Sequence, residues 1–293
     1  LMEVGISLTK MDRGSEKIIY TGESFGDLFM ADDSPNEFVV PTGVHCIDSV
    51  ITEGGIRNRT LMTIAGRSSM GKTCFSMFMA HSIAKNHPAK RILFYSLEMT
   101  ALDILHKQVT TSAKRKIKTM PRDVKAMAFL KSKEEAVLVV HEKPLASIDY
   151  ICMTARIDSA RNPIAVIVVD YIGIVQNNKK MESQALKMAD VSAQLAGLAK
   201  ELNCIVIALS QVNREYANRV DKRPLMSDAA DSSGSERNSD MWLGIYRPEF
   251  DSDERHLAEQ FIVNCRKDRF GSPWEATLMF NDGVFKEPPP RNW

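Results

Sequence analysis

Long hydrophobic runs are missing from this sequence. The longest apolar stretches, such as Ile164 to Val169 and Cys204 to Leu209, are six residues long. A helix that crosses a bilayer needs roughly 20 apolar residues. We therefore expect no transmembrane segment and no membrane partner.

Cysteine is also scarce and widely scattered. Their spacing does not resemble that of a disulfide-rich protein and indicates buried free thiols in a reducing cytoplasm. We therefore expect a cytoplasmic location, in a bacterial cell or a phage-infected host. Neither a CxxC nor an HExxH pattern occurs, so we predict no protein-ligated zinc site. The five cysteines are Cys46, Cys74, Cys152, Cys204 and Cys265.

An excess of one charge is absent too, since 38 Lys and Arg balance 37 Asp and Glu. Any contact with nucleic acid must then come from local clusters rather than from a basic chain. The 293 residues are 44% hydrophobic. This composition excludes a disordered or fibrous chain and is enough for one large α/β domain or two small ones.

The first 40 residues differ from the rest because they are mostly polar and charged. Their one apolar island, Phe25 to Met30, has the spacing of a single helical face. We predict that residues 1–40 form a linker or arm. The island either docks on a neighbouring subunit or packs on its own domain, which we place at residues 41–293.

From Pro41 onward, short apolar runs alternate with helical patterns, most clearly over Ser183 to Leu202. Nearly continuous apolar strands separated by helices indicate a mostly parallel sheet covered on both faces. The last three strands are close together in sequence and predict an antiparallel extension. The expected strands are Leu61 to Ala65, Arg91 to Ser96, Val137 to His141, Ile164 to Asp170, Cys204 to Ser210, Met241 to Tyr246, Glu259 to Cys265 and Trp274 to Phe280.

A phosphate-binding loop follows the first of these strands. The sequence matches GxxxxGK[ST] and precedes the amphipathic run Cys74 to Lys85, which is the required strand, loop and helix context. Backbone N–H groups and the positive end of the helix dipole favour phosphate binding there. We expect Lys72 to reach the β and γ phosphates of ATP and Thr73 to ligate Mg²⁺. The predicted nucleotide-binding residues are Gly66, Arg67, Ser68, Ser69, Met70, Gly71, Lys72, Thr73 and Cys74.

Three polar residues follow other predicted strands and are expected at the same sheet edge. Asp170 ends a buried strand and is the expected second carboxylate for Mg²⁺. Glu98 is the candidate that orients and deprotonates the attacking water, although it can instead serve only the helix that starts near Thr100. Gln211 is either a γ-phosphate sensor or a simple turn residue.

Several separated segments together resemble the DnaB-type hexameric replicative helicases, in their RecA-like C-terminal ATPase domain. The resemblance covers about residues 41–285. Ser-Leu-Glu-Met and Leu-Ser-Gln-x-Asn-Arg are more specific than the phosphate-binding loop. The segments are Gly66 to Thr73, Ser96 to Met99, Val169 to Tyr171, Leu198 to Asn203, Ala208 to Arg214 and Asp221 to Pro224.

The resemblance implies an ATP-driven helicase motor that forms a ring, expected to be a hexamer, on single-stranded DNA. It also implies 5′ to 3′ translocation, primase and a helicase loader as partners, and an N-terminal collar domain that is missing or reduced here. In such helicases a neighbouring subunit supplies a basic pair from a Lys-x-Arg-x-Gly segment. Lys267 and Arg269 match that pattern, and a permanently charged arginine suits the transition-state charge on the phosphate. A solvated basic turn is the alternative.

DNA contact is predicted in two loops. Lys179 and Lys180 follow the Asp170 strand and can track a phosphate backbone, although a solvated loop explains them equally well. In the second loop the family often carries an arginine where this chain has Ala230. Arg237 likewise replaces a usual glutamine, which favours a divergent member, such as one encoded by a phage. The predicted contacts of the second loop are Asp231, Ser232, Ser233 and Gly234.

Two other functions remain open at this point. A RecA or RadA-type recombinase shares the phosphate-binding loop, Glu98 and Asp170, but fits the segment around Lys267 and Arg269 less well. A KaiC-like regulatory ATPase would bind protein partners and no DNA. The basic run Lys114 to Lys118 resembles a nucleic-acid patch, but a solvated helix is the favoured interpretation.

Overall fold

The computed structural model describes residues 39–178, 181–213, 219, 221–229, 236–250 and 259–289. These residues belong to one compact unit, Val39–Trp293. The predicted arm over residues 1–40 lies outside them except for its last two positions. The arm and its docking therefore stay predictions.

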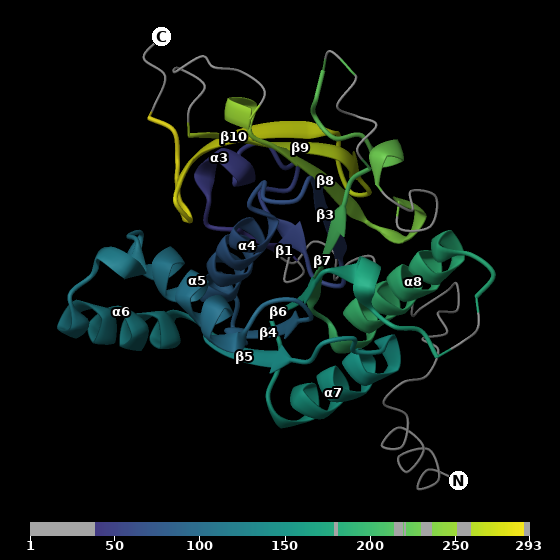
Figure 1. Ribbon diagram of the computed structural model, residues 1–293, viewed down its shortest axis with the longest axis horizontal. Helices are drawn as coiled ribbons and strands as arrows, with labels where there is room; N and C mark the ends of the chain where they lie inside the picture. Colours follow the sequence, from purple (N-terminus) through teal and green to yellow (C-terminus); the bar gives the residue numbers. More distant parts are fainter. Residues whose placement is uncertain are drawn as a thin grey trace, which may run out of the picture. The chain divides into compact units, whose positions relative to one another are not determined.

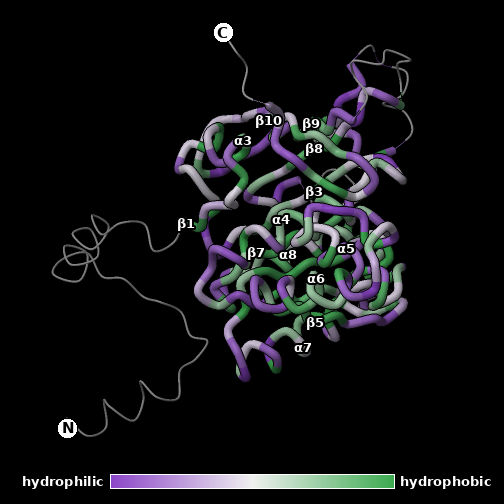
Figure 2. The backbone as a smooth tube through the Cα atoms, turned by 90° about the vertical axis from the view of Figure 1, so that its left-hand side faces the viewer, coloured by the Kyte–Doolittle hydropathy of each residue, from purple (hydrophilic) through white to green (hydrophobic). Residues whose placement is uncertain are grey.

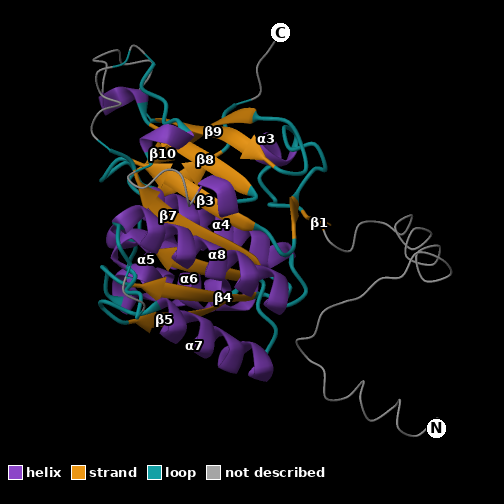
Figure 3. Cartoon of the chain, turned by 90° about the vertical axis from the view of Figure 1, so that its right-hand side faces the viewer, coloured by secondary structure: helices purple, strands orange, loops and turns teal. Residues whose placement is uncertain are grey.

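A nine-stranded sheet organises these described ranges, in the order β11-β10-β9-β8-β3-β7-β6-β4-β5. Figure 3 shows its strands stacked from β5 at the bottom to β9 and β10 at the top. A separate two-stranded ribbon pairs β1 with β2. The strands are β1 (Val39–Val40), β2 (Ile56–Arg57), β3 (Leu61–Gly66), β4 (Arg91–Ser96), β5 (Val137–Glu142), β6 (Val166–Asp170), β7 (Ile205–Gln211), β8 (Met241–Tyr246), β9 (Gln260–Asp268), β10 (Trp274–Asn281) and β11 (Val284–Lys286).

Strands β8, β3, β7, β6, β4 and β5 are parallel, and β9, β10 and β11 extend the sheet as antiparallel strands. The predicted fold class is therefore confirmed. The helices are α3 (His45–Asp48), α4 (Lys72–Asn86), α5 (Ala101–Ala113), α6 (Arg122–Glu135), α7 (Ile148–Arg161) and α8 (Gln184–Leu202).

Alternation along the parallel strands builds one core on each face of the sheet. On β6, Val166 and Val168 join the core that contains α4, whereas Ile167 and Val169 join the core that contains α7 and α8. Successive side chains of a strand point to opposite faces, so a strand buried on both faces is apolar throughout. Figure 1 shows α4, α5 and α6 apart from α7 and α8, and Figure 2 shows the hydrophobic colour concentrated in the interior.

Several sequence-based boundaries need correction. The strand expected from Ile164 begins at Val166, and the one expected from Cys204 begins at Ile205. Of the three strands expected to be antiparallel, β8 is parallel to β3, while the short strand β11 was not expected. The basic run after α5 is only partly helical, because Lys114 caps α5 in the left-handed conformation and a short 3-10 helix, Ile117–Thr119, begins three residues later.

Helix α4 is not amphipathic as predicted. It is buried on nearly every side, because it packs between the sheet, α5 and the aromatic cluster of the C-terminal strands. Apolar residues on all its faces are therefore explained by tertiary packing. Among the helices in the described ranges, none is long and apolar enough to span a bilayer.

A polar cluster ties α4 to α5 and α6. The Glu135 carboxylate accepts hydrogen bonds from Ser112 Oγ at 2.6 Å and Lys85 Nζ at 2.9 Å, and its Oε2 lies 3.0 Å from His81 Nε2. Burial lowers the pKa of His81. Burial alone would raise the pKa of Glu135, but the bonds from Ser112, Lys85 and His81 hold it at about 2.

This cluster predicts acid sensitivity. The contribution of Glu135 is present above its ordinary pKa of 4.5 and is lost as the pH falls toward 2. The unfolded form of His81 takes up a proton below 6.5, which destabilises the fold in the same direction. We expect Glu135→Gln to lower the free energy of unfolding by about 2 kcal/mol at pH 7 and to flatten its decline between pH 5 and 3. Urea unfolding across this pH range measures both effects.

The exposed neighbour Glu134 provides the matched control. Glu134→Gln should follow the unmodified protein at every pH. Equal pH profiles for both variants would show that Glu135 is not responsible.

Candidate functional site

The phosphate-binding loop joins the central strand β3 to helix α4. Gly71 caps the helix with φ of +95°, a left-handed conformation that a side chain would strain. Gly66 lies against β8, where a Cβ atom would come within 2.6 Å of Ile245 Cγ1. The buried Lys72 ammonium donates to the carbonyls of Gly66 and Arg67 at 2.9 and 3.0 Å. Lysine and loop therefore form one compact turn at the carboxyl edge of the sheet.

Within this predicted loop the residues differ in exposure. Met70 is buried and anchors the loop, whereas Arg67, Ser68 and Ser69 are exposed at its tip. Cys74 is partly exposed in the first turn of α4, where Lys107 Nζ lies 3.3 Å from its sulfur. The tip thus leaves its backbone open to an anion, while the base of the loop is fixed.

The Thr73 hydroxyl donates to Asp170 Oδ2 at 2.7 Å. Burial raises the pKa of the Asp170 carboxyl, and the Glu98 charge acts in the same direction against the bond from Thr73. Burial lowers the pKa of Lys72, opposed by the charges of Asp170 and Glu98. Four predicted residues therefore share one electrostatic environment.

Glu98 and Gln211 complete this edge. Asp170 on β6 pairs with Ser96 on β4, and Leu97 N donates to the Asp170 carbonyl. Strand β4 therefore places the exposed Glu98 beside the loop. Gln211 aligns with Gly66 in the pairing of β7 with β3. The residues predicted for the loop, for magnesium (Thr73 and Asp170), for water activation (Glu98) and for γ-phosphate sensing (Gln211) therefore all lie at the carboxyl ends of the parallel strands.

The donor set is suitable for a magnesium ion. Mg²⁺ prefers hard oxygen ligands and is usually held by one or two protein oxygens together with substrate phosphate. The Thr73 hydroxyl and the Asp170 carboxylate supply oxygens that are already adjacent. These two residues therefore fit the metal predicted for them.

Sequence reasoning missed a cavity of about 630 Å³ beside the loop. Helix α5, residues 116–119 and the β10–β11 turn line it, and Lys107 connects it to Cys74 at the start of α4. No linear motif marks this cavity because its walls come from distant segments. Its lining includes Cys74, Met99, Asp103, His106, Lys107 and Asp282.

Lys267 and Arg269 lie at the opposite edge of the sheet. Strand β9 runs antiparallel to β8, which places Asp268 against Met241 and hence beside Met62 near the start of β3. Arg269 N bonds to Asp240, which in turn bonds to Leu61, the first residue of β3. At a strand rise of about 3.3 Å per residue, Leu61 lies roughly 16 Å from Gly66. Neither basic residue is therefore part of the site formed by its own phosphate-binding loop.

The two basic side chains have separate partners. Lys267 Nζ donates to the carbonyls of Glu236 and Arg237 at 2.8 and 3.3 Å. Burial, together with the Arg269 charge, lowers the pKa of Lys267. The side chain of Arg269 is 47% exposed, and its Nη1 lies 2.5 Å from Asp240 Oδ1. Sequence reasoning did not select Asp240.

The predicted DNA contacts lie outside the described residues. These are Lys179 and Lys180 of the first loop and Asp231, Ser232, Ser233 and Gly234 of the second. Their assignment stays a prediction.

Comparison with known proteins identifies the family. The model of the DnaB-like helicase C-terminal domain matches residues 39–286. The chain belongs to this family. The DnaB-like match begins at β1 and ends at β11, so it contains both edges of the sheet described above.

Relatives of this DnaB-like domain include named replicative helicases. The replicative DNA helicase DnaB of Buchnera aphidicola subsp. Baizongia pistaciae is 30% identical over 236 residues, which are 78% of this chain and 51% of the relative. A probable plasmid replicative DNA helicase of Chlamydia psittaci is 30% identical over 255 residues, 83% of this chain and 54% of the relative. The chain thus spans about half the length of the curated relatives it matches.

Solved structures with the same fold include a DnaB-like replicative helicase, described together with its interactions with primase. It has a TM-score of 0.81 and 25% identity, and the similarity covers 97% of this chain and 70% of that one. A second solved structure, described as an ATPase domain, has a TM-score of 0.79 and 26% identity, with 91% of this chain and 98% of that one covered. The part of the chain that the structure describes therefore shares the DnaB-like fold.

The pair formed by Thr73 and Asp170 predicts magnesium-dependent nucleotide binding. We expect Asp170→Asn to weaken ADP binding about 10- to 100-fold in Mg²⁺, because an amide is a poorer ligand than a carboxylate. Without Mg²⁺, binding should change little. Titration calorimetry with and without the metal measures the difference. Asp123→Asn, an exposed substitution on α6, is the control. Equal weakening with and without Mg²⁺ would contradict a metal role.

Proposed function

We propose that this chain is the ATP-hydrolysing motor domain of a replicative DNA helicase and that it assembles as a ring. One observation carries the proposal. A complete phosphate-binding edge and an arginine-bearing edge lie at opposite ends of β3. Copies arranged head to tail can bring the arginine edge of one against the loop of the next, and such an arrangement forms a ring when the rotation between copies completes a circle.

The residues of the loop edge have distinct roles in this proposal. Lys72 contacts the β and γ phosphates and opposes their charge. Glu98 is exposed beside the loop, where it orients the attacking water and accepts its proton. Gln211, next to Gly66, senses the γ-phosphate. Magnesium held by Thr73 and Asp170 would neutralise phosphate charge during the transfer.

Arg269 completes the site from the neighbouring subunit. Its guanidinium has a fixed charge and several donors in one plane, which suits the charge that spreads over the γ-phosphate oxygens. Lys267 adds positive charge from the same segment. Hydrolysis then depends on assembly, because one chain cannot bring its own Arg269 to its own loop.

The cavity beside the loop suits the nucleoside part of ATP. It adjoins Cys74, which directly follows the metal-binding Thr73, and its walls combine Met99 with polar groups such as Lys107. Most of the residues that line it are charged or polar, among them Asp103, His106 and Asp282, and such side chains can form hydrogen bonds with a ribose and a base. We place the base and ribose there.

DNA and protein partners follow from the relatives. We propose single-stranded DNA as the track, a homo-oligomeric, hexameric ring, and contacts with primase and a helicase loader. The structural neighbour described with primase supports the primase contact. The replicative helicases among the relatives support a helicase over a recombinase or a KaiC-like regulatory ATPase. The cytoplasmic location stays a prediction.

A forked DNA substrate with a 5′ single-stranded tail tests the motor. The unmodified protein should displace the strand in the presence of ATP, and both Lys72→Ala and Arg269→Ala should abolish displacement. Arg269→Ala should lower ATP turnover by about 10³-fold while nucleotide binding persists, because its own loop is intact. ATP turnover without any effect of single-stranded DNA would instead favour the KaiC-like alternative.

Mixed rings test whether Arg269 acts across the interface. A Lys72→Ala subunit keeps its arginine edge, and an Arg269→Ala subunit keeps its loop. A random one-to-one mixture therefore restores about one interface in four, and ATP turnover should exceed that of either variant alone. The control mixture pairs Lys72→Ala with the double variant and contains no complete interface. No gain over this control would contradict action in trans.

A further inference from the structure

The structure assigns Asp240 as the positioning residue for Arg269, an inference that rests on the proposed function of Arg269. Asp240 directly precedes β8, and its side chain is only 3% exposed. It holds both the main chain and the side chain of the arginine. The buried carboxylate thereby directs the exposed guanidinium toward the adjoining subunit.

Four hydrogen bonds and ionic contacts converge on Asp240. Its Oδ1 lies 2.5 Å from Arg269 Nη1, and its carbonyl accepts from Arg269 N at 2.9 Å. Its Oδ2 accepts from Leu61 N at 3.0 Å, and its own N–H donates to the Leu61 carbonyl at 2.9 Å. Leu61 is fully buried at the start of β3. The arginine is thus fixed to a fully buried strand at the centre of the sheet.

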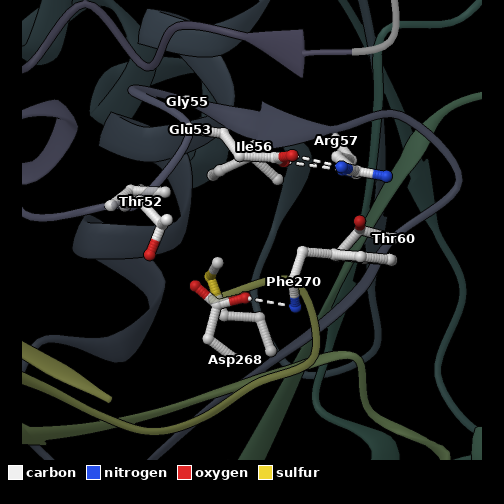
Figure 4. A pocket seen from close by; sticks show the side chains of 10 residues that line it. Thr52, Glu53, Gly55, Ile56, Arg57, Thr60, Asp268 and Phe270 are labelled. Carbon is white, nitrogen blue, oxygen red and sulfur yellow. Dashed lines mark hydrogen bonds and ion pairs between the residues drawn. The ribbon is translucent and has the colours of Figure 1, made fainter. Parts of the chain in front are cut away.

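The other side of the arginine turn is held by the 51–57 segment. Arg57 forms an ion pair with Glu53 and lies over the Phe270 ring, 4.6 Å from its centroid. Gly271 packs so closely that a Cβ atom there would lie 2.4 Å from Thr52 Oγ1. Figure 4 shows this seam, with Phe270 and Asp268 facing Thr52, Ile56 and Arg57.

The seam between the 51–57 segment and the arginine turn is too tightly packed to hold a ligand. The space left between these side chains is about 10 Å³, which is about the minimum for one water molecule. The backbone on both sides of Arg269 is therefore packed in place. Only the guanidinium retains freedom, and Asp240 is the group that restricts it.

This restriction has a kinetic consequence. A free arginine side chain samples many rotamers, and a misplaced catalytic group can lower a rate by on the order of 100-fold. Ordering the guanidinium before the subunits meet removes that loss from the chemical step. Asp240 therefore acts on kcat through Arg269 and leaves ATP binding at its own loop unchanged.

The test is steady-state ATP turnover of assembled rings. Asp240→Asn keeps an oxygen that accepts from Leu61 N but loses the charge that holds Arg269. We expect kcat to fall on the order of 10-fold with KM for ATP within about twofold and with ring assembly unchanged. Asp268→Asn is the matched control, because its amide oxygen still accepts from Phe270 N. That variant should keep the kcat of the unmodified protein.

A double variant separates positioning from a merely structural role. If Asp240 acts through Arg269, adding Asp240→Asn to Arg269→Ala lowers kcat no further, whereas independent effects would multiply. Multiplied effects, or an unchanged kcat in Asp240→Asn, would overturn the inference. Full turnover in Arg269→Ala alone would instead overturn the proposed function.

A second substitution covers the case in which Asp240→Asn does not assemble. Asp240→Glu keeps the carboxylate but shifts it by one methylene. It should assemble, bind ATP with the KM of the unmodified protein and show a reduced kcat. A kcat equal to that of the unmodified protein would overturn positioning by Asp240.

Discussion

Parallel pairing on both sides of β3 fixes the two ends of one fully buried strand. Strand β7 aligns Gln211 with Gly66 at the carboxyl end, and β8 places Asp240 beside Leu61 at the amino end. All six residues of β3 are buried, so neither end can shift without disturbing both cores. The position of this strand therefore determines where the phosphate-binding loop and the turn that contains Arg269 lie.

Burial has a second effect at the loop edge, where it opposes charge on both Lys72 and Asp170. The pKa of the lysine is lowered and that of the carboxyl is raised because water is excluded from each. The same exclusion strengthens every remaining electrostatic contact, because little water screens it. A polyanion such as a nucleotide therefore meets positive charge of greater effect here than at an open surface.

The sequence was sufficient for features that depend on local order. The glycines and Lys72 were predictable because strand, loop and helix follow one another directly, and Asp170 because it ends an apolar run. The burial of α4 was not predictable, since distant aromatic residues of β9 and β11 cover its second side. The antiparallel direction predicted for β8 was wrong because its parallel pairing with β3 depends on a neighbour about 180 positions away.

Asp240 escaped prediction for a related reason. It precedes a strand rather than following one, so it lies at the edge where open α/β sheets do not ordinarily bind ligands. Its partners, Leu61 and Arg269, are remote in the chain and adjacent only in the sheet. Periodicity and motif spacing contain no information about such contacts. The cavity beside Lys107 was missed in the same way.

The length of β3, which separates the two edges, also determines how many complete ATP sites an assembly contains. Under the proposed function each copy contributes half of two different sites, and the two halves never meet within one chain. An open row of n copies then holds n − 1 complete sites, whereas closing the row adds the last one. Opening a ring by a single interface, as is needed to admit a strand without a free end, silences one site and leaves the others intact.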